Sequence, residues 1–249
     1  MATATFEDEL LAIEADMARR RYGSPGTKQL LAGQRGEESF KVDVVQFLFH
    51  TVGFVSALRH LYARCPLPDL RMELAESLYE EETGRMSNSA PHLDLYYQYA
   101  RSWGFEPTEL TKHARILPEM GAVVHWYQYA ATSLDPLIGL AALTLGGEGQ
   151  NGTWAGIPGA SRVLADALRA SYGKTPEDVL FYEVHDAADK DHCAVGRRNL
   201  ARHVATPKQQ EQIRMAIRIT GDAFESYFRG VLNRRLSECW GESSAFFYL

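Results

Sequence analysis

Apolar residues recur along the chain at intervals of three and four, the spacing of amphipathic helices, and proline or glycine interrupts them. The segment from Glu38 to Ala63 is so rich in apolar side chains that we expect a central, buried helix there. The same pattern predicts further helices at about residues 5–22, 69–82, 92–103, 119–145, 161–172, 176–204 and 207–235. We see no convincing set of alternating strand patterns. The sequence therefore predicts an all-α fold, a bundle of seven or eight helices in which residues 1–249 form a single domain.

Composition and charge narrow the class of protein. The chain has 249 residues, of which 45% are hydrophobic and 23% charged, as is typical of a globular protein with a packed core. The net charge is −6, and Lys and Arg are scattered along the sequence. Nucleic acid is therefore not an expected partner, because binding it requires a concentrated cationic surface.

Location and cysteine usage follow from other features. The N-terminal segment has acidic residues before its basic cluster and no apolar run of the kind found in signal peptides. No stretch has the roughly 18 continuous apolar residues of a membrane span. Membrane is therefore not an expected partner, and we expect a cytoplasmic protein. Cys65, Cys193 and Cys239 are widely separated, which argues against a disulfide framework or a thiolate zinc site.

The most informative residues lie late in the chain, where His185, Asp189 and His192 share one predicted helix. Spacings of four and seven place the three side chains within an arc of roughly 60° on one helix face. Two imidazoles and a carboxylate suit iron or manganese, and also zinc, better than calcium or magnesium. An acidic, solvated helix face that happens to contain two histidines is the alternative.

Further carboxylates and a histidine precede this helix. Residues 80–82 are three consecutive glutamates, and His92 follows ten residues after Glu82. On an unbroken helix Glu82 and His92 would point apart, but the break expected at residues 87–91, which ends in Pro91, removes that objection. Glu148 closes an apolar segment, where a buried carboxylate requires a partner or a metal. A solvated helix end and an ordinary loop residue are the respective alternatives.

Together these features resemble the haem-oxygenase-like di-iron oxidases, relatives of the thiaminase-II and pyrroloquinoline-quinone-synthase fold. The resemblance rests on Glu82-Thr-Gly with His92 ten residues on, a carboxylate after a central apolar helix, and the late His-x-x-x-Asp-x-x-His. It implies a bundle of haem-oxygenase-like type that holds two iron ions, Fe(II) or Fe(III), per chain. The implied ligands are Glu82, His92, Glu148, His185, Asp189 and His192.

The resemblance also implies a chemistry. Two ferrous ions can together deliver two electrons to the co-substrate O2, and the protein supplies ligand geometry and a dry pocket. Four acidic residues near the ligands are candidates for orienting the histidines: Glu81, Glu183, Asp186 and Asp191. We expect a small amine or amino-acid-derived substrate, oxygenated at nitrogen or cleaved at a C–C bond. Such chemistry leaves room for an external electron donor and for a homodimer.

Substrate contacts are predicted for Arg197, Arg198 and Tyr127. Either arginine could hold a substrate carboxylate in a bidentate contact, although a solvated helix face explains at least one of them. Aromatic residues at helical spacing are also typical of a plain core.

Two rival interpretations concern other classes of protein. Residues 147–152 match G-x-G-x-x-G, but a dinucleotide site requires a preceding strand, and here a helical segment precedes the motif. The second rival is a metal-free protein of the same fold, either a thiaminase-like hydrolase or a small-molecule binder. The hydrolase would need a cysteine nucleophile, and Cys193 is the one near the proposed site.

Overall fold

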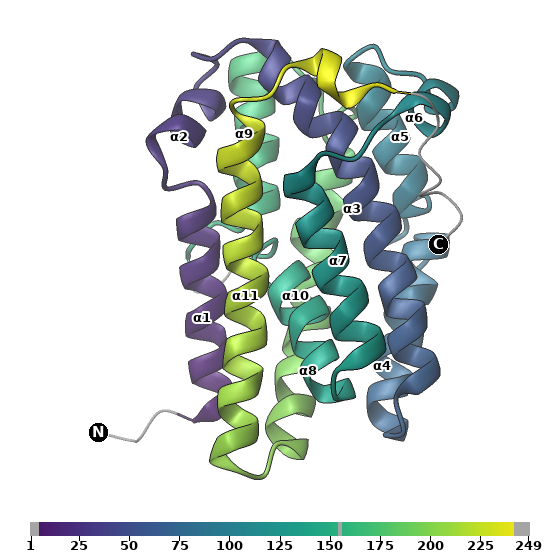
Figure 1. Ribbon diagram of the computed structural model, residues 1–249, viewed down its shortest axis with the longest axis vertical. Helices are drawn as coiled ribbons and strands as arrows, with labels where there is room; N and C mark the ends of the chain where they lie inside the picture. Colours follow the sequence, from purple (N-terminus) through teal and green to yellow (C-terminus); the bar gives the residue numbers. More distant parts are fainter. Residues whose placement is uncertain (1–4, 154–155, 242–249) are drawn as a thin grey trace.

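The computed structural model describes residues 5–153 and 156–241, and within these ranges the regular structure is helical. The long helices lie side by side along the long axis of the molecule (Figure 1). The elements are α1 (Phe6–Arg21), α2 (Pro25–Leu31), α3 (Glu37–Arg64), α4 (Pro68–Thr83), α5 (His92–Ser102), α6 (Pro107–His113), α7 (Pro118–Ser133), α8 (Pro136–Leu140), the π-helix η1 (Ala141–Glu148), α9 (Ala160–Tyr172), α10 (Leu180–His203), α11 (Pro207–Val231) and the short 3₁₀ helix η2 (Leu236–Cys239). The all-α prediction is confirmed, and the described helices slightly outnumber the seven or eight expected.

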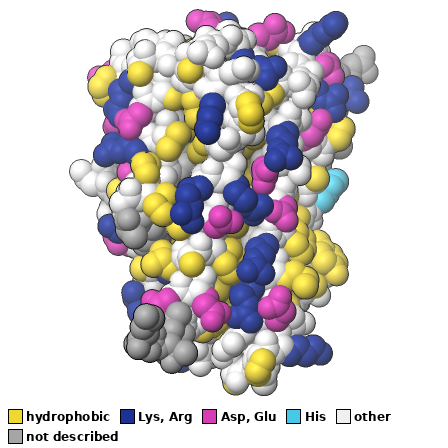
Figure 2. All heavy atoms as spheres, turned by 90° about the vertical axis from the view of Figure 1, so that its left-hand side faces the viewer, with side chains coloured by type: hydrophobic (Ala, Val, Ile, Leu, Met, Phe, Trp, Pro, Cys, Tyr) yellow, Lys and Arg dark blue, Asp and Glu magenta, His cyan; other side chains and the backbone are white. Residues whose placement is uncertain are grey.

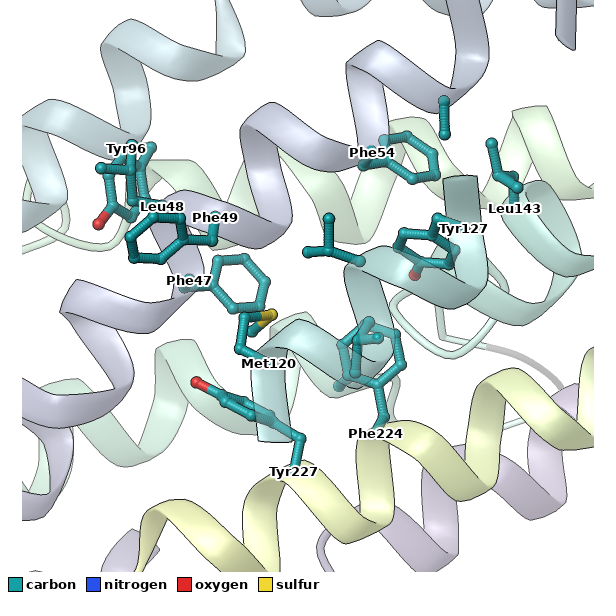
Figure 3. Packing of buried hydrophobic residues seen from close by; sticks show 14 of the residues in the cluster. Phe47, Leu48, Phe49, Phe54, Tyr96, Met120, Tyr127, Leu143, Phe224 and Tyr227 are labelled. Carbon is teal, nitrogen blue, oxygen red and sulfur yellow. The ribbon is translucent and has the colours of Figure 1, made fainter. Parts of the chain in front are cut away.

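The helix α3 is the central element of the bundle. It packs against α4, α5 and α7, and it is long and apolar enough to cross a membrane by those two criteria alone. However, 78% of its apolar stretch is buried within the protein, as in the core helix of a bundle. Figure 3 shows Phe47 and Phe54 of this helix packed towards Tyr127 of α7 and Phe224 of α11. The expectation of a buried central helix is therefore confirmed.

Local capping explains where the observed helices differ from those predicted. The helix expected over residues 119–145 is broken after Ser133, because Pro136 begins α8 and Asp135 accepts the N–H of Leu137 at 2.9 Å. The short helix α2 was not predicted. It begins after Ser24, whose hydroxyl accepts a hydrogen bond from the N–H of Thr27. Residues 23–26, a glycine- and proline-containing stretch of the kind that ends helices, therefore start a new helix here.

The π-helix η1 delivers Glu148 to the interior. All eight of its residues are buried, and the N–H of Gly149 donates to the carbonyl of Thr144 five residues earlier. A Cβ at Gly146 would lie 2.6 Å from Cβ of Thr220 on α11. The glycines around Glu148 therefore allow close helix packing. The G-x-G-x-x-G match, residues 147–152, covers the end of the π-helix and the turn after it. It therefore follows a helix and not a strand, which is not the setting of a dinucleotide site.

Charges of both signs alternate on the surface around α1. Figure 2 shows Lys and Arg side chains interspersed with Asp and Glu on the face turned to the viewer. Arg20 of α1 pairs with Asp222 of α11 at 2.9 Å, and Arg214 of α11 pairs with Glu9 at 2.7 Å. This face therefore presents paired charges and no continuous basic surface.

We predict that Gly146→Ala destabilises the metal-free protein by about 1–3 kcal/mol, because the new methyl group overpacks the contact with Thr220. Gly121→Ala in α7 is the matched control. Its Cβ would lie 4.0 Å from the Ile116 side chain, so it should stabilise by up to about 1 kcal/mol through helix propensity. Urea unfolding followed by circular dichroism measures both changes. Equal effects of the two substitutions would show that the π-helix is not tightly packed.

Candidate metal centre

Two groups of three side chains bring potential metal ligands together inside the bundle. The first contains Glu81 from α4, His92 from α5 and His185 from α10, with the ligand atoms all within 4.8 Å of one another. The second, under the same limit, contains Glu148 from the π-helix and two further residues of α10, namely Asp189 and His192. Five of the six residues predicted from the sequence therefore lie in these groups, and α10 contributes to both.

The sixth predicted residue, Glu82, is replaced by its neighbour Glu81. The buried face of α4 contains Leu70 and Leu74, and at about 100° per residue position 81 lies about 20° from Leu70, whereas position 82 lies about 120° away. Glu82 accordingly points to the surface, where it pairs with Arg59. The prediction that placed Glu82 in the cluster is corrected by one residue, and the apolar stripe of α4 was the signal that could have shown it.

The turn after α4 returns the chain to the first group. Gly84 adopts a left-handed conformation with φ 61°, and a Cβ there would lie 2.2 Å from the carbonyl oxygen of Ala90. The carboxylate of Glu80 accepts the N–H and the hydroxyl of Ser87, which fixes the turn. The helix α5 then begins at His92, next to the end of α4. The predicted break between these helices is confirmed.

Hydrogen bonds orient the two imidazoles of the first group. Nδ1 of His92 lies 3.0 Å from Glu81, and Nε2 lies 3.3 Å from Glu80. Nδ1 of His185 donates to the carbonyl oxygen of Phe181 at 2.6 Å. Because that donation requires Nδ1–H, the Nε2 of neutral His185 carries the free lone pair. Such outer contacts are typical of metal-binding histidines.

The second group contains donor atoms without protein partners. The side-chain amide of Asn151 donates to Asp189 at 2.8 Å, which fixes one carboxylate. Nδ1 of His192 lies 4.0 Å from Oε1 of Glu148, beyond hydrogen-bond distance. That Nδ1 and Oε2 of Glu148 are buried and accept or donate no hydrogen bond within the described residues. Buried polar atoms of this kind are rare unless a ligand, an ion or a water satisfies them.

Burial and mutual repulsion disfavour the charged forms of Glu148, Asp189 and His185. Glu81 and His92 differ, because against burial each favours the charged form of the other: His92 lowers the pKa of Glu81, and Glu81 raises that of His92. Burial, then the charges of Asp189 and Glu81, raise the pKa of Glu148 well above its usual value. Burial likewise raises the pKa of Asp189 to about 8, and burial together with the nearby His92 lowers that of His185 to about 4. A cation between these groups would remove the repulsion. The donor set, three carboxylates and three imidazoles, therefore fits a pair of first-row metal ions such as iron.

Both groups border one internal cavity. Glu81, His185 and Glu148 form part of its wall, so the two groups are neighbours on the same space. Much of the remaining wall is apolar and aromatic, formed by Phe47, Phe54, Leu164 and Phe181. Such a cavity can exclude bulk water from a reaction at the clustered carboxylates.

The residues predicted to bind substrate do not line this cavity. Both arginines belong to α10. Arg197 is buried in an ion pair with Glu14 at 2.5 Å, and Arg198 is exposed on the side of α10 away from the cavity. Tyr127 is buried behind the wall, with its hydroxyl 3.4 Å from Nε2 of His50. His50 does line the cavity, and sequence reasoning missed it because a single histidine in an apolar helix carries no distinguishing pattern.

Cys193, the nucleophile required by the hydrolase interpretation, lies away from the cavity wall. Its thiol is fully buried and points to the carbonyl oxygen of Thr144 at 3.5 Å. Burial, with the nearby carboxylates, raises the pKa of this thiol well above its usual value, which disfavours the reactive thiolate.

The sequence matches the family of iron-containing redox enzymes over residues 44–224, a stretch that includes both groups of ligands. The chain belongs to this family. The resemblance to haem-oxygenase-like oxidases drawn from the sequence is thereby confirmed. The match supports an enzyme, because the members of this family are described as iron-containing redox enzymes.

Curated relatives are named 4-aminobenzoate synthase. The chain is 27% identical to the protein of that name from Nitrosomonas europaea over 163 residues, which are 65% of this chain and 61% of the relative. It is 26% identical to the one from Chlamydia trachomatis over 162 residues, 65% of each chain. The chain thus spans less than two thirds of the length of these relatives.

Solved structures show the same fold at low sequence identity. A TenA homologue from Pseudomonas syringae superposes with a TM-score of 0.71 at 14% identity, covering 91% of this chain and 92% of that one. A domain with a haem-oxygenase-like fold from Shewanella denitrificans gives a TM-score of 0.69 at 13% identity, with 90% and 89% covered. The bundle is therefore of the haem-oxygenase-like type.

We predict that Glu81→Gln lowers the affinity for Fe(II) by at least about 100-fold. Loss of a residue that only orients a ligand typically lowers metal affinity by about 10- to 100-fold, and loss of a ligand itself should lower it more. Glu82→Gln is the matched control, since the neighbouring carboxylate points to the surface and should leave iron binding unchanged. Iron content after anaerobic loading and desalting measures both. Loss of iron in the Glu82 variant alone would restore the original sequence assignment.

Iron affinity should rise with pH between about 6 and 8. Burial opposes protonation of His92, but Glu81, Asp189 and Glu80 together raise its pKa to about 9, and that of Asp189 is about 8. Metal binding must therefore release the protons that His92 and Asp189 carry. For each proton released, the affinity for iron rises about tenfold when the pH rises by one unit. Anaerobic calorimetry in buffers of different ionisation enthalpy counts these protons. An affinity independent of pH would contradict the assigned ligands.

Proposed function

We propose that the protein is a non-haem di-iron oxidase or oxygenase that uses O2 to oxidise a small amine or amino-acid-derived metabolite. The observation that carries the proposal is the pair of three-residue groups on one cavity, each offering carboxylate and imidazole donors. One group alone would support a single ion. Two neighbouring groups suit two ions that act on one molecule of O2.

The proposed ligands divide between the two ions. Glu81, His92 and His185 would hold one iron, and Glu148, Asp189 and His192 would hold the other. When bound, two ferrous ions supply two electrons to O2 and leave coordination positions for oxygen and substrate. The chain's own residues set the geometry of these donors and keep the histidines in defined tautomers.

The chain's other contribution is the environment of the reaction. Phe47, Phe54 and Phe181 form apolar wall next to the ligands, which limits water around a reacting substrate. His50 also faces the cavity, and burial, then the charge of Arg21, lowers its pKa to about 3. At neutral pH His50 is therefore uncharged, and it can accept or donate one hydrogen bond to a bound molecule.

The names of the relatives support an amine-containing metabolite. 4-Aminobenzoate, the product named for them, is an aromatic amine, and the apolar cavity wall suits an aromatic ring. Oxygenation at nitrogen is the reaction that we propose for this chain, with oxidative C–C cleavage as the alternative at the same centre. Mass analysis of products formed under ¹⁸O2 separates the two, since N-oxygenation retains both carbon fragments in one product.

The proposal predicts a coloured transient when anaerobic, iron-loaded protein is mixed with an O2 pulse. His185→Ala or Asp189→Ala should abolish O2 consumption and the transient, because each removes a donor from one group. Far-ultraviolet circular dichroism should stay nearly unchanged, since helix packing supplies the fold. His60→Ala, an exposed histidine on α3, is the control and should retain activity.

Other outcomes would count against the proposal. Turnover by protein stripped of metal would favour the metal-free hydrolase or binder. Full O2 consumption by both ligand variants would place the reactive centre elsewhere.

A further inference from the structure

A buried arginine faces the cavity from the side of α1. Arg21 is the last residue of α1, is only 4% exposed and forms part of the cavity wall together with Glu81 and Glu148. Arginine is almost never so deeply buried unless a partner balances its charge. The position of this guanidinium therefore calls for a partner.

Within the described residues, no carboxylate or carbonyl partner is found for Arg21. Nε has no hydrogen-bond partner, and no ion pair reaches the guanidinium within 4 Å. Aromatic rings hold it instead, with the guanidinium carbon 4.6 Å from the ring centre of Phe228, 4.7 Å from Phe224 and 5.6 Å from Tyr22. These contacts fix the orientation of the group, but a ring face accepts no conventional hydrogen bond, and Nε is left without a partner.

Nearby acids are already engaged. Asp43 accepts a hydrogen bond from the hydroxyl of Tyr227 at 2.7 Å. Burial raises the pKa of Asp43 to about 6, although that hydrogen bond and the charge of Arg21 both act to lower it. Arg197, the other buried arginine, has its charge balanced by Glu14. Both arginines are buried, but Arg21 faces the cavity and has no acidic partner within 4 Å among the described residues.

We propose that Arg21 binds a carboxylate of the substrate, so that the substrate is a small aromatic carboxylate whose other end reaches the clustered metal ligands. The planar guanidinium can donate two parallel hydrogen bonds to a carboxylate. Phe47, Phe54 and Phe181 line the same cavity and suit an apolar ring. The role in substrate oxidation rests on the proposed di-iron function, whereas carboxylate binding itself does not.

The wall composition favours a carboxylate over a phosphate. Arg21 is the one Lys or Arg among the described wall residues. The same wall carries two acids: Glu81, whose pKa the nearby His92 lowers against burial, and Glu148. A singly charged carboxylate is matched by one guanidinium, but a doubly charged phosphate would be left partly unbalanced near those acids. An aromatic carboxylate that carries an amine fits both ends of the cavity.

The test compares two probe pairs of nearly equal shape on iron-loaded protein without oxygen: 4-aminobenzoate against 4-aminobenzamide, and L-phenylalanine against its amide. Calorimetry should show that the wild-type protein prefers a carboxylate of at least one pair by about 10- to 100-fold, as a charge-assisted contact provides. Arg21→Met should remove that preference while amide affinity and iron content persist. Arg20→Met is the control, since that neighbour pairs with Asp222 at the surface.

Two results would overturn the inference. Equal binding of carboxylate and amide in both pairs by the wild-type protein is one, and an undiminished preference in Arg21→Met is the other. If Arg21→Met fails to fold, Arg21→Lys serves instead: it keeps the charge but loses the bidentate contact, and the preference should fall several-fold. An unchanged preference in that variant would also overturn the inference.

The same measurements keep this inference separate from the proposed function. If the wild-type protein binds no iron, but still prefers the carboxylate and loses that preference in Arg21→Met, the di-iron proposal alone is refuted. If the iron-loaded protein consumes O2, but Arg21→Met prefers the carboxylate as strongly as the wild-type protein does, the role of Arg21 alone is refuted.

Discussion

Three carboxylates and three imidazoles are buried together at the centre of this bundle, and their mutual electrostatics constrain everything around them. Glu81, Glu148 and Asp189 repel one another when ionised. Burial raises the pKa of Glu148 and Asp189, whereas the neighbouring His92 lowers that of Glu81 against its burial. A folded protein retains such a cluster only when something repays its desolvation. A pair of cations would do so, and the chain's membership of a family of iron-containing redox enzymes agrees with that requirement.

The unusual local structures of the chain serve this cluster. The helix α10 contributes residues to both groups, while the turn at Gly84 and the π-helix bring the remaining donors to it. Each device departs from regular α-helix at the point where a ligand enters the interior. Phe47 and Phe54 of α3 then line the cavity beside the donors. The bundle thus provides a rigid frame, and its irregular segments provide the site.

Much of this arrangement was predictable from the sequence. Helical periodicity located the long helices, and the spacing of His185, Asp189 and His192 identified a shared helix face. The choice between Glu81 and Glu82 depends on a rotation of about 100°, which three consecutive glutamates hide and only the apolar stripe of α4 reveals. Arg21 could not be assigned, because its role depends on the absence of a partner in three dimensions.

Anomalous X-ray diffraction at the iron edge, on crystals of the iron-loaded protein, tests the central claim most directly. We expect two peaks, one among Glu81, His92 and His185 and one among Glu148, Asp189 and His192. A single peak, a peak beside Glu82, or a folded protein that binds no iron at either group would contradict the account.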